Sequence, residues 1–363
     1  MVFVGGPRQV GKTTFALGFL KSPPRNETHP AYMNWDRSEH RERLLGGEMP
    51  PGEKIVLLDE IHKYARWRGL VKGLYDTQRS HLSILVTGSA RLDYYRKGGD
   101  SLQGRYHYYR LHPISLRELD SEAGAKAARL LLRFGGFPEP LFTGSDREHR
   151  RWQKEHQERV IYDDLRDLER VREVSLIELL VHHLPRCVGS PLSVKSLSGL
   201  LQVAHESAER WLTILERLYF CFRIGPYGSA RIRAVKKERK LYLWDWSQAP
   251  EGGPRFENMV ASQLLKYCHW REDTQGYRME LRYLRDTDKR EVDFVVLRDG
   301  AAEFAVECKT GESGVSPACI YFKERTKIPA FYQVHLGSKD YTHAGSGVRV
   351  LPFWRFCKEL ELP

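Results

Sequence analysis

The segment from Gly6 to Thr14 has the residue types and the spacing of a phosphate-binding loop. Its sequence, GPRQVGKTT, fits the pattern G-x-x-x-x-G-K-[ST], with Gly11, Lys12 and Thr13 at fixed positions. Glycines let backbone N–H groups wrap around a phosphate, and the following helix adds the positive end of its dipole. We expect the Lys12 ammonium to reach the β- and γ-phosphates and the Thr13 hydroxyl to bind Mg²⁺. Backbone contacts are expected from the other loop residues, Pro7, Arg8, Gln9, Val10 and Thr14.

Two carboxylates, Asp59 and Glu60, follow an apolar run that begins at Ile55. Asp59 would hold the magnesium, usually through water, and Glu60 would polarise the attacking water. Acidic residues at the solvated end of an ordinary strand are the alternative. Ser89, after the next apolar run, is a candidate sensor of the γ-phosphate, with a simple turn as the alternative. Residues 59–62 also fit the D-E-x-H box of helicases, which need a second RecA-like domain that the later sequence does not predict.

A second group of charged residues could form a metal site near the end of the chain. Glu307 and Lys309 are two positions apart after an apolar run, so period-two alternation puts both on one face of a strand. Asp293 lies in the preceding apolar run, and a hairpin would bring it to Glu307. The carboxylates would bind Mg²⁺, and Lys309 would orient or deprotonate a water. This D…E-x-K arrangement is typical of restriction-endonuclease-like nucleases, and Glu257 would supply a further acid from a helix. Ordinary charges at strand ends are the alternative.

The elements that must position the first site alternate between strands and helices. Apolar runs of the kind found in buried parallel sheets predict strands at 2–4, 32–35, 55–58 and 84–86. Leu70, Leu74 and Tyr75 have helical spacing between the last two of these strands. We therefore predict one α/β domain over residues 1–120.

The middle of the chain, residues 121–248, is predicted to be helical and to contain a winged helix. Helices are expected at 193–201 and 206–218, followed by a strand at 219–224 and a basic segment at 231–240. The second helix presents Glu206, Glu209 and Glu216, which repel phosphates, whereas the basic segment suits contact with a nucleic-acid backbone. A packing or oligomerisation module is the alternative. The basic residues expected in the wing are Arg231, Arg233, Lys236, Lys237, Arg239 and Lys240.

From residue 249 to residue 363 the pattern returns to α/β, after the Gly/Pro cluster at 249–254. We predict a helix around 260–265 and strands at 292–297 and 304–308. The fold class expected for the whole chain is therefore α/β with a helical middle.

Composition narrows the class of partner. The 363 residues carry a net charge of +11, which favours polyanions such as nucleic acid, and 41% are hydrophobic, as in soluble globular proteins. We see no apolar stretch long enough for a membrane helix and no secretory leader. The six cysteines form no C-x-x-C pair, which argues against a zinc ribbon. We expect a cytoplasmic protein without a membrane partner.

The order of several motifs resembles a large, mostly uncharacterised prokaryotic family that joins an AAA-type ATP-binding domain to a C-terminal domain of unknown function. The N-terminal motifs are GPRQVGKTT, LLDEIHK, TGSAR and GRYHYYRLHPIS, and the later ones are GGFPEP, KLYLWD, FENMV, REVDFVV and VECK. The resemblance implies ATP and Mg²⁺ as cofactors, and a C-terminal half related to restriction-endonuclease-like folds. It also makes Arg105 a candidate arginine finger acting on a neighbouring subunit in a homo-oligomer, with an ordinary surface arginine as the alternative.

Two functional hypotheses follow from the motifs. The first is a Mg²⁺-dependent ATPase that acts on DNA or another nucleic acid, with a nuclease-like C-terminal site. The second is an ATP-driven switch or scaffold for protein partners, with a catalytically silent nuclease-like domain. Relatives usually carry a helical stretch before the first strand, whereas here only Met1–Val4 precede the loop, so we expect weakened affinity or selectivity for the base.

Overall fold

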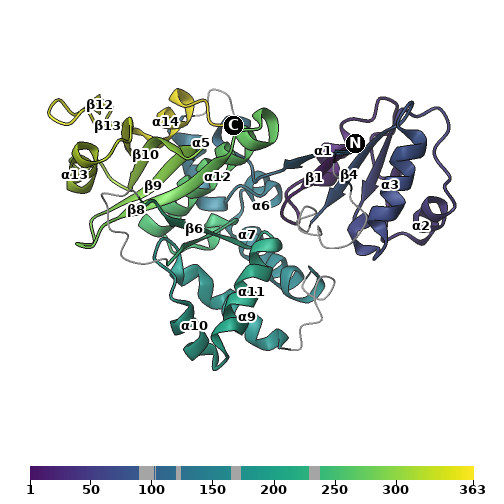
Figure 1. Cartoon of the computed structure of the whole chain (residues 1–363), viewed down its shortest axis with the longest axis horizontal. Helices are drawn as coiled ribbons and strands as arrows, with labels where there is room; N and C mark the ends of the chain where they lie inside the picture. Colours follow the sequence, from purple (N-terminus) through teal and green to yellow (C-terminus); the bar gives the residue numbers. More distant parts are fainter. Residues whose placement is uncertain (90–101, 103, 120–123, 165–172, 229–237) are drawn as a thin grey trace. The chain divides into compact units, whose positions relative to one another are not determined.

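The computed structural model describes residues 1–89, 102, 104–119, 124–164, 173–228 and 238–363 (Figure 1). The chain divides into two compact units, each with a mixture of helices and strands. The first unit contains Met1–His112, Asp163–Arg170 and Arg217–Tyr219, and the second contains Pro113–Tyr162, Val171–Glu216 and Phe220–Pro363. Within the described residues, no helix is both long and apolar enough to cross a membrane.

The first unit is built on a five-stranded parallel sheet with the order β2-β3-β4-β1-β5. The predicted strands are present, and β5, with its alternation of polar and aromatic residues, is an additional one. The strands are β1 (Val2–Gly5), β2 (Tyr32–Asn34), β3 (Ile55–Asp59), β4 (Ser83–Gly88) and β5 (His107–Arg110). Because all strands run in one direction, their carboxyl ends meet at one edge, where the predicted nucleotide residues lie.

Successive residues of each strand enter two different cores, as period-two alternation requires. Phe3 and Val56 pack with Trp67 on one face, whereas Val4 and Leu57 belong to the core on the other. The helices of this unit are α1 (Lys12–Leu17), α2 (Ser38–Leu45), the 3₁₀ turn η1 (Ile61–Lys63) and α3 (Trp67–Gln78). Burial on both faces explains why these strands are continuous apolar runs.

The second unit begins with a series of helices. The described ones are α4 (Leu116–Leu119), α5 (Ala125–Phe134), α6 (Pro138–Thr143), α7 (Asp146–Arg159), the π-helical turn η2 (Val160–Asp164), α9 (Val174–His183), η3 (Leu184–Cys187), α10 (Val194–Leu201) and α11 (His205–Arg217). The predicted pair of helices is present as α10 and α11, joined at Gln202, which has a left-handed φ of 52°. The strand expected at 219–224 is β6 (Cys221–Pro226), which pairs antiparallel with β7 (Lys240–Leu243).

A mixed eight-stranded sheet, with the order β12-β13-β11-β10-β9-β8-β6-β7, forms the rest of this unit. Phe304 contacts Tyr267 of α12, and Ala305 packs with Phe322 of α13, so the two helices cover opposite faces. The elements are η4 (Trp246–Gln248), α12 (Gly253–Gln275), β8 (Met279–Arg285), β9 (Glu291–Arg298), β10 (Ala301–Lys309), α13 (Pro317–Arg325), β11 (Ala330–His335), β12 (Tyr341–Thr342), β13 (Arg349–Pro352) and α14 (Phe353–Glu359).

Lys240 was expected to lie in a solvent-facing basic wing, and this prediction is wrong. Its side chain is fully buried on β7, where Glu257, Glu291 and Asp293 surround its ammonium, while Ile224 of β6 and Pro191 pair with its backbone. Arg239 is exposed, whereas the other predicted wing residues, Arg231, Arg233, Lys236 and Lys237, lie outside the described residues.

Candidate functional site

The loop that follows β1 adopts the backbone shape of an anion-binding nest. Gln9 and Gly11 both have positive φ, at 62° and 99°, and Gly11 caps the start of α1. Alternating right- and left-handed residues turn successive N–H groups toward one side of a loop. A Cβ atom on Gly6 would lie 2.4 Å from the carbonyl oxygen of Leu111, so the loop backbone packs against the chain that follows β5. The glycines are therefore needed for both curvature and close packing.

The Lys12 side chain is buried in this loop. Its ammonium donates hydrogen bonds to the carbonyl oxygens of Gly6, at 3.1 Å, and of Pro7, at 2.7 Å. These acceptors carry no net charge, so an incoming phosphate, with its full negative charge, competes well for the ammonium. The geometry therefore places a cation inside the loop, as the sequence predicts.

Asp59 is held at the end of β3 by three hydroxyl groups. Its Oδ2 accepts hydrogen bonds from Thr13, at 2.9 Å, and from Tyr32, at 2.8 Å, while its Oδ1 accepts one from Thr87 at 2.5 Å. The Thr13 hydroxyl and the Asp59 carboxylate are thus neighbours, and both are the hard oxygen ligands that Mg²⁺ prefers. The residues present fit a magnesium ion that is shared with a bound nucleotide.

Glu60 follows Asp59 in a left-handed conformation, with φ at 55°. Ser89 donates to its Oε2 at 3.4 Å, and His62 Nε2 lies 3.6 Å from the same oxygen. Burial raises the pKa of the Glu60 carboxyl, and Lys12 opposes this shift by favouring the ionised form. A carboxylate with a raised pKa near an ammonium is suited to orienting and polarising a water molecule. The structure thus brings the predicted Ser89 and Glu60 together.

Tyr32 and Thr87 were missed as site residues. Tyr32 is buried in β2 with its hydroxyl on Asp59, and Asn34 donates to that hydroxyl at 3.0 Å. Burial, followed by the Asp59 charge, raises the pKa of Tyr32, so it stays a neutral donor. The sequence signal for Thr87 was its place at the end of β4. A tyrosine within a short apolar strand carries no comparable signal.

Arg105 lies away from these residues within its own unit. It precedes β5, and its backbone carbonyl accepts from the Met1 amino group, so it belongs to the amino edge of the parallel sheet. Its guanidinium pairs with Asp76 of α3, at 3.0 Å. Because the loop that follows β1 lies at the opposite, carboxyl edge of the sheet, Arg105 is away from the nucleotide residues of its own unit, and the finger role remains a prediction about a neighbouring subunit.

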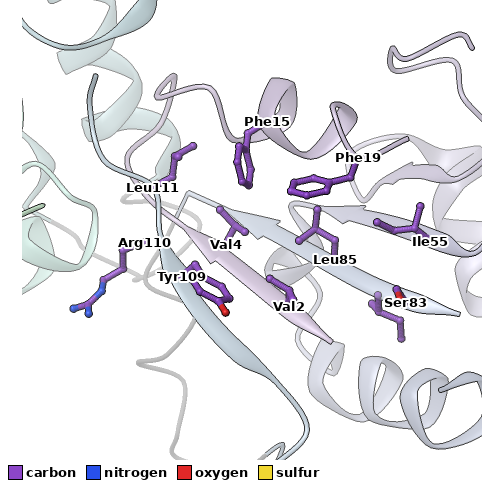
Figure 2. A pocket seen from close by; sticks show the side chains of 11 residues that line it. Val2, Val4, Phe15, Phe19, Ile55, Ser83, Leu85, Tyr109, Arg110 and Leu111 are labelled. Atoms are coloured by element: carbon purple, nitrogen blue, oxygen red, sulfur yellow. The ribbon is translucent and has the colours of Figure 1, made fainter. Parts of the chain in front are cut away.

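An apolar cavity of about 420 Å³ lies on the α1 side of the sheet (Figure 2). Phe15 of α1 and Phe19, just beyond the end of that helix, extend above Val4 and Leu85 of the strands, and 45% and 52% of their surfaces are exposed. Its lining includes no residue of the loop from Gly6 to Gly11, so the cavity is distinct from the phosphate position. The lining is completed by Val2, Ile55, Ser83, Ile84, Tyr109, Arg110 and Leu111.

In the second unit, the structure brings the predicted Asp293, Glu307 and Lys309 together. Strands β9 and β10 are antiparallel, with Phe294 opposite Val306, so Asp293 and Glu307 are neighbours across the hairpin. Lys309 Nζ lies 2.7 Å from Glu307 Oε1, and Asp293 Oδ2 accepts from the Cys308 backbone N–H at 2.8 Å. The expected hairpin is therefore present.

Lys240 and Glu291 also belong to this group, and neither was predicted to. The Lys240 ammonium lies 2.5 Å from Glu291, 3.2 Å from Glu257 and 3.6 Å from Asp293. We call these four residues, together with Glu307 and Lys309, the carboxylate–lysine cluster. Burial, and then the charge of Asp293, raises the pKa of Glu257 to about 8 and that of Glu307 to about 7.

The cluster differs from the metal site that the sequence predicts. Glu257 uses one oxygen for both Lys240 and the Tyr242 hydroxyl, at 3.2 and 2.7 Å. Among the residues that the structure describes, no three His, Cys, Asp or Glu side chains are placed to hold a metal ion. An ammonium occupies the space between the carboxylates, so the side chains present do not fit a divalent cation in this arrangement.

The chain matches three known families in succession. Residues 1–120 match a family described as an AAA domain, so the N-terminal region is an AAA-type ATPase domain. Residues 125–249 and 252–356 match two families described as domains of unknown function, DUF8612 and DUF4143.

Three curated relatives are uncharacterized proteins. One from Methanocaldococcus jannaschii is 20% identical over 97% of this chain and 86% of its own length. A second from the same organism is 26% identical and is matched over 76% of this chain and 65% of the relative. One from Mycobacterium tuberculosis is 25% identical over 68% of this chain and 54% of the relative. The chain therefore spans only part of these last two proteins.

Among solved structures, the chain overlaps with the ORC1 protein of Aeropyrum pernix, determined in complex with DNA. The overlap covers 67% of this chain and 83% of that one, with 16% identity and a TM-score of 0.31. A score this low does not define a shared fold for the whole chain.

Proposed function

We propose that this protein is a Mg²⁺-dependent ATPase. The observation that carries the proposal is the meeting of three features at one sheet edge: the nest around Gly11, the buried Lys12 ammonium and the Thr13–Asp59 hydrogen bond. The match of residues 1–120 to an AAA domain supports the same activity.

Each residue of the site would have a distinct task. The nest and Lys12 would bind the β- and γ-phosphates, and Thr13 and Asp59 would hold the magnesium, which when bound neutralises phosphate charge. Glu60 would orient the attacking water, and Ser89 would stabilise the Glu60 carboxylate through the hydrogen bond at 3.4 Å. Thr87 of β4 would keep the Asp59 carboxylate in position through its own hydrogen bond.

Phosphate release from ATP tests the proposal directly. Lys12→Ala should lower kcat/KM by about 10²–10³-fold, because it removes a cation that stabilises developing phosphate charge. Lys21→Ala is the matched control, since Lys21 is an exposed lysine just beyond α1. Turnover that is unchanged in Lys12→Ala would contradict the proposal.

We propose nucleic acid as the partner on which the ATPase acts. The net charge of +11 supports this choice. The glutamates of α11 repel nucleic-acid phosphates less than the sequence suggests, because Arg223 neutralises two of them. Arg223 pairs with Glu209, at 2.9 Å, and with Glu216, at 2.8 Å. Binding to duplex DNA should weaken steeply with salt, and affinity that is independent of salt would favour a protein partner.

Arg105 would act on the nucleotide of a neighbouring subunit in a homo-oligomer. Its ion pair with Asp76 is partly exposed, so a phosphate could replace the carboxylate. Mixing inactive Glu60→Gln subunits with inactive Arg105→Ala subunits should restore part of the activity, because some interfaces then contain both intact groups. Failure of the mixture to recover activity would leave Arg105 as a surface residue.

Strand cleavage at the nuclease-like site is the second candidate function, and it would require the Lys240 ammonium to leave the carboxylates so that a divalent cation could bind there. The observation that favours it is the convergence of Asp293, Glu307 and Lys309 on β9 and β10. Incubating labelled DNA with Mg²⁺ or Mn²⁺ tests it, with Asp293→Ala as the control. An ATPase without cleavage would leave the second unit as a binding module, which is the alternative that the motifs also allow.

A further inference from the structure

Lys240 is the most completely enclosed charged side chain of the carboxylate–lysine cluster, with no surface exposed to solvent. It comes from β7, whereas its carboxylate partners come from α12 and β9. The partners Glu257, Glu291 and Asp293 approach its ammonium at 3.2, 2.5 and 3.6 Å.

We propose that the Lys240 ammonium is the resident cation of this cluster and closes it to divalent metal ions. The inference opposes the second candidate function, because a cluster closed to divalent ions could not support metal-dependent cleavage, and it is independent of whether the N-terminal site hydrolyses ATP. It assigns to Lys240 the charge-neutralising place that the sequence alone gives to Mg²⁺.

The charges in the cluster support this assignment. A buried ammonium is stable only when carboxylates or other acceptors surround it, and its three N–H groups can be shared among three carboxylates. Burial lowers the pKa of Lys240, but Asp293, Glu257 and Glu291 outweigh burial and raise it, so the side chain remains charged at any physiological pH. A divalent ion at the same carboxylates would face this fixed positive charge at close range.

The backbone of the loop at Gly189 encloses the Glu257 side of the cluster. A Cβ atom on Gly189 would lie 2.9 Å from Glu257 Oε2, so the loop before α10 packs directly on that oxygen. Residues Val188 and Pro191 of the same loop bridge to Leu241 and Lys240. The other Glu257 oxygen already accepts from Lys240 and Tyr242.

Glu307 shows where a metal would bind once the ammonium is removed. Only 5% of the residue is exposed, and its Oε2 has no hydrogen-bond partner among the residues that the structure describes, while Oε1 pairs with Lys309. Glu307 Oε2 and the neighbouring Asp293 carboxylate could therefore bind a metal ion, but the positive charge of Lys240 repels a divalent cation from them. Replacing Lys240 with a neutral residue should convert the cluster into a divalent cation site.

Direct Mn²⁺ binding to the full chain, followed by electron paramagnetic resonance without nucleotide, tests the proposal. Wild-type protein should show no Mn²⁺ site that depends on Asp293, whereas Lys240→Met should gain one site that Asp293→Asn removes. Any binding that Asp59→Asn removes belongs to the ATP site. Loss of ATP turnover would leave this result unaffected, so the two proposals fail separately.

Folding of the variants needs its own control, because Lys240→Met leaves buried carboxylates without a cation. Combining Lys240→Met with Glu291→Gln removes one of these charges, and Lys240→Arg keeps the cation and should stay closed to Mn²⁺. A wild-type or Lys240→Arg protein that binds Mn²⁺ through Asp293 would overturn the proposal. So would a folded Lys240→Met/Glu291→Gln protein that gains no site.

Discussion

The two units each contain a buried lysine beside carboxylates, and the two lysines differ in what accepts their hydrogen bonds. Lys12 donates to the backbone carbonyls of Gly6 and Pro7, whereas Lys240 lies among the carboxylates of Glu257, Glu291 and Asp293. Carbonyls carry no net charge, and a phosphate can replace them. Three carboxylates bind an ammonium too strongly for an exchange of this kind.

A lysine and two carboxylates can therefore form either an anion-binding site or a closed ion-pair cluster. Which of the two forms depends on the neighbouring groups that contact the lysine and the acids. At the N-terminal site, hydroxyl groups of Thr13, Tyr32 and Thr87 donate hydrogen bonds to Asp59, and Lys12 donates to two uncharged carbonyls that a phosphate can replace. At the C-terminal site, the Lys240 ammonium neutralises the carboxylates without a metal ion.

Glu60→Gln should have the largest effect on ATP turnover. If turnover did not fall, the N-terminal site would not be the catalytic one of the two sites compared. The amide cannot polarise water as a carboxylate does, so kcat should fall by roughly 10²–10⁴-fold while ATP binding changes little. Phosphate release and the binding of a fluorescent ATP analogue measure the two effects. Glu48→Gln, at an exposed glutamate of the same unit, is the control. A parallel loss of binding and turnover would mean that Glu60 is structural.

Lys240→Met should destabilise the second unit by about 3–5 kcal/mol, because removing one partner of a buried ion pair leaves uncompensated charge. Lys309→Met should cost much less, since 39% of the Lys309 side chain is exposed beside a single carboxylate. Urea denaturation of both variants gives the difference. Equal losses would show that Lys240 is no more essential than a surface lysine.

Glu307→Gln should flatten the pH dependence of stability. The folded-state pKa of Glu307 is raised from 4.5 to about 7, so its contribution is fully present below pH 4.5 and is lost as the pH rises through about 7. The wild type should therefore lose about 1.4 kcal/mol per pH unit across this window from Glu307 alone. Above about pH 7, the Glu307→Gln variant should be more stable than the wild type. Glu324→Gln, at an exposed position on α13, should leave the profile unchanged.

Tyr32→Phe should have the smallest effect. It removes one hydrogen bond to Asp59, a loss of about 0.5–1.5 kcal/mol, which corresponds to roughly a two- to tenfold lower kcat. If Tyr32 positions the Asp59 carboxylate for magnesium, the Mg²⁺ concentration for half-maximal turnover should also rise. Tyr75→Phe on α3 is the control. A lower melting temperature with an unchanged Mg²⁺ requirement would indicate a purely structural role.

Much of the first unit was predictable because its signals are local. The loop from Gly6 to Thr14 is contiguous, and Asp59 and Glu60 end a strand that is apolar throughout. Strand β5 was not predicted from the sequence. It has only four residues, and its alternation of polar and aromatic side chains differs from the continuous apolar runs of the buried strands. Tyr32 could not be assigned, because its role depends on the pairing of β2 with β3.

In the second unit, the hairpin of Asp293 and Glu307 was predictable from period-two alternation, and the location of Lys240 was not. In the sequence, Lys240 ends a basic run, which predicts a solvent-facing wing. Its burial follows from the pairing of β7 with β6 and from the approach of Glu257 on α12.

The sequence by itself determined the phosphate-binding loop, its acidic partners and the hairpin that joins Asp293 to Glu307, because each depends on residues close together in the chain or on strand periodicity. Only the tertiary structure decided which cation lies among the C-terminal carboxylates. Electrostatic energy depends on distance in space, and Lys240 and Glu291 meet at 2.5 Å although many residues separate them along the chain.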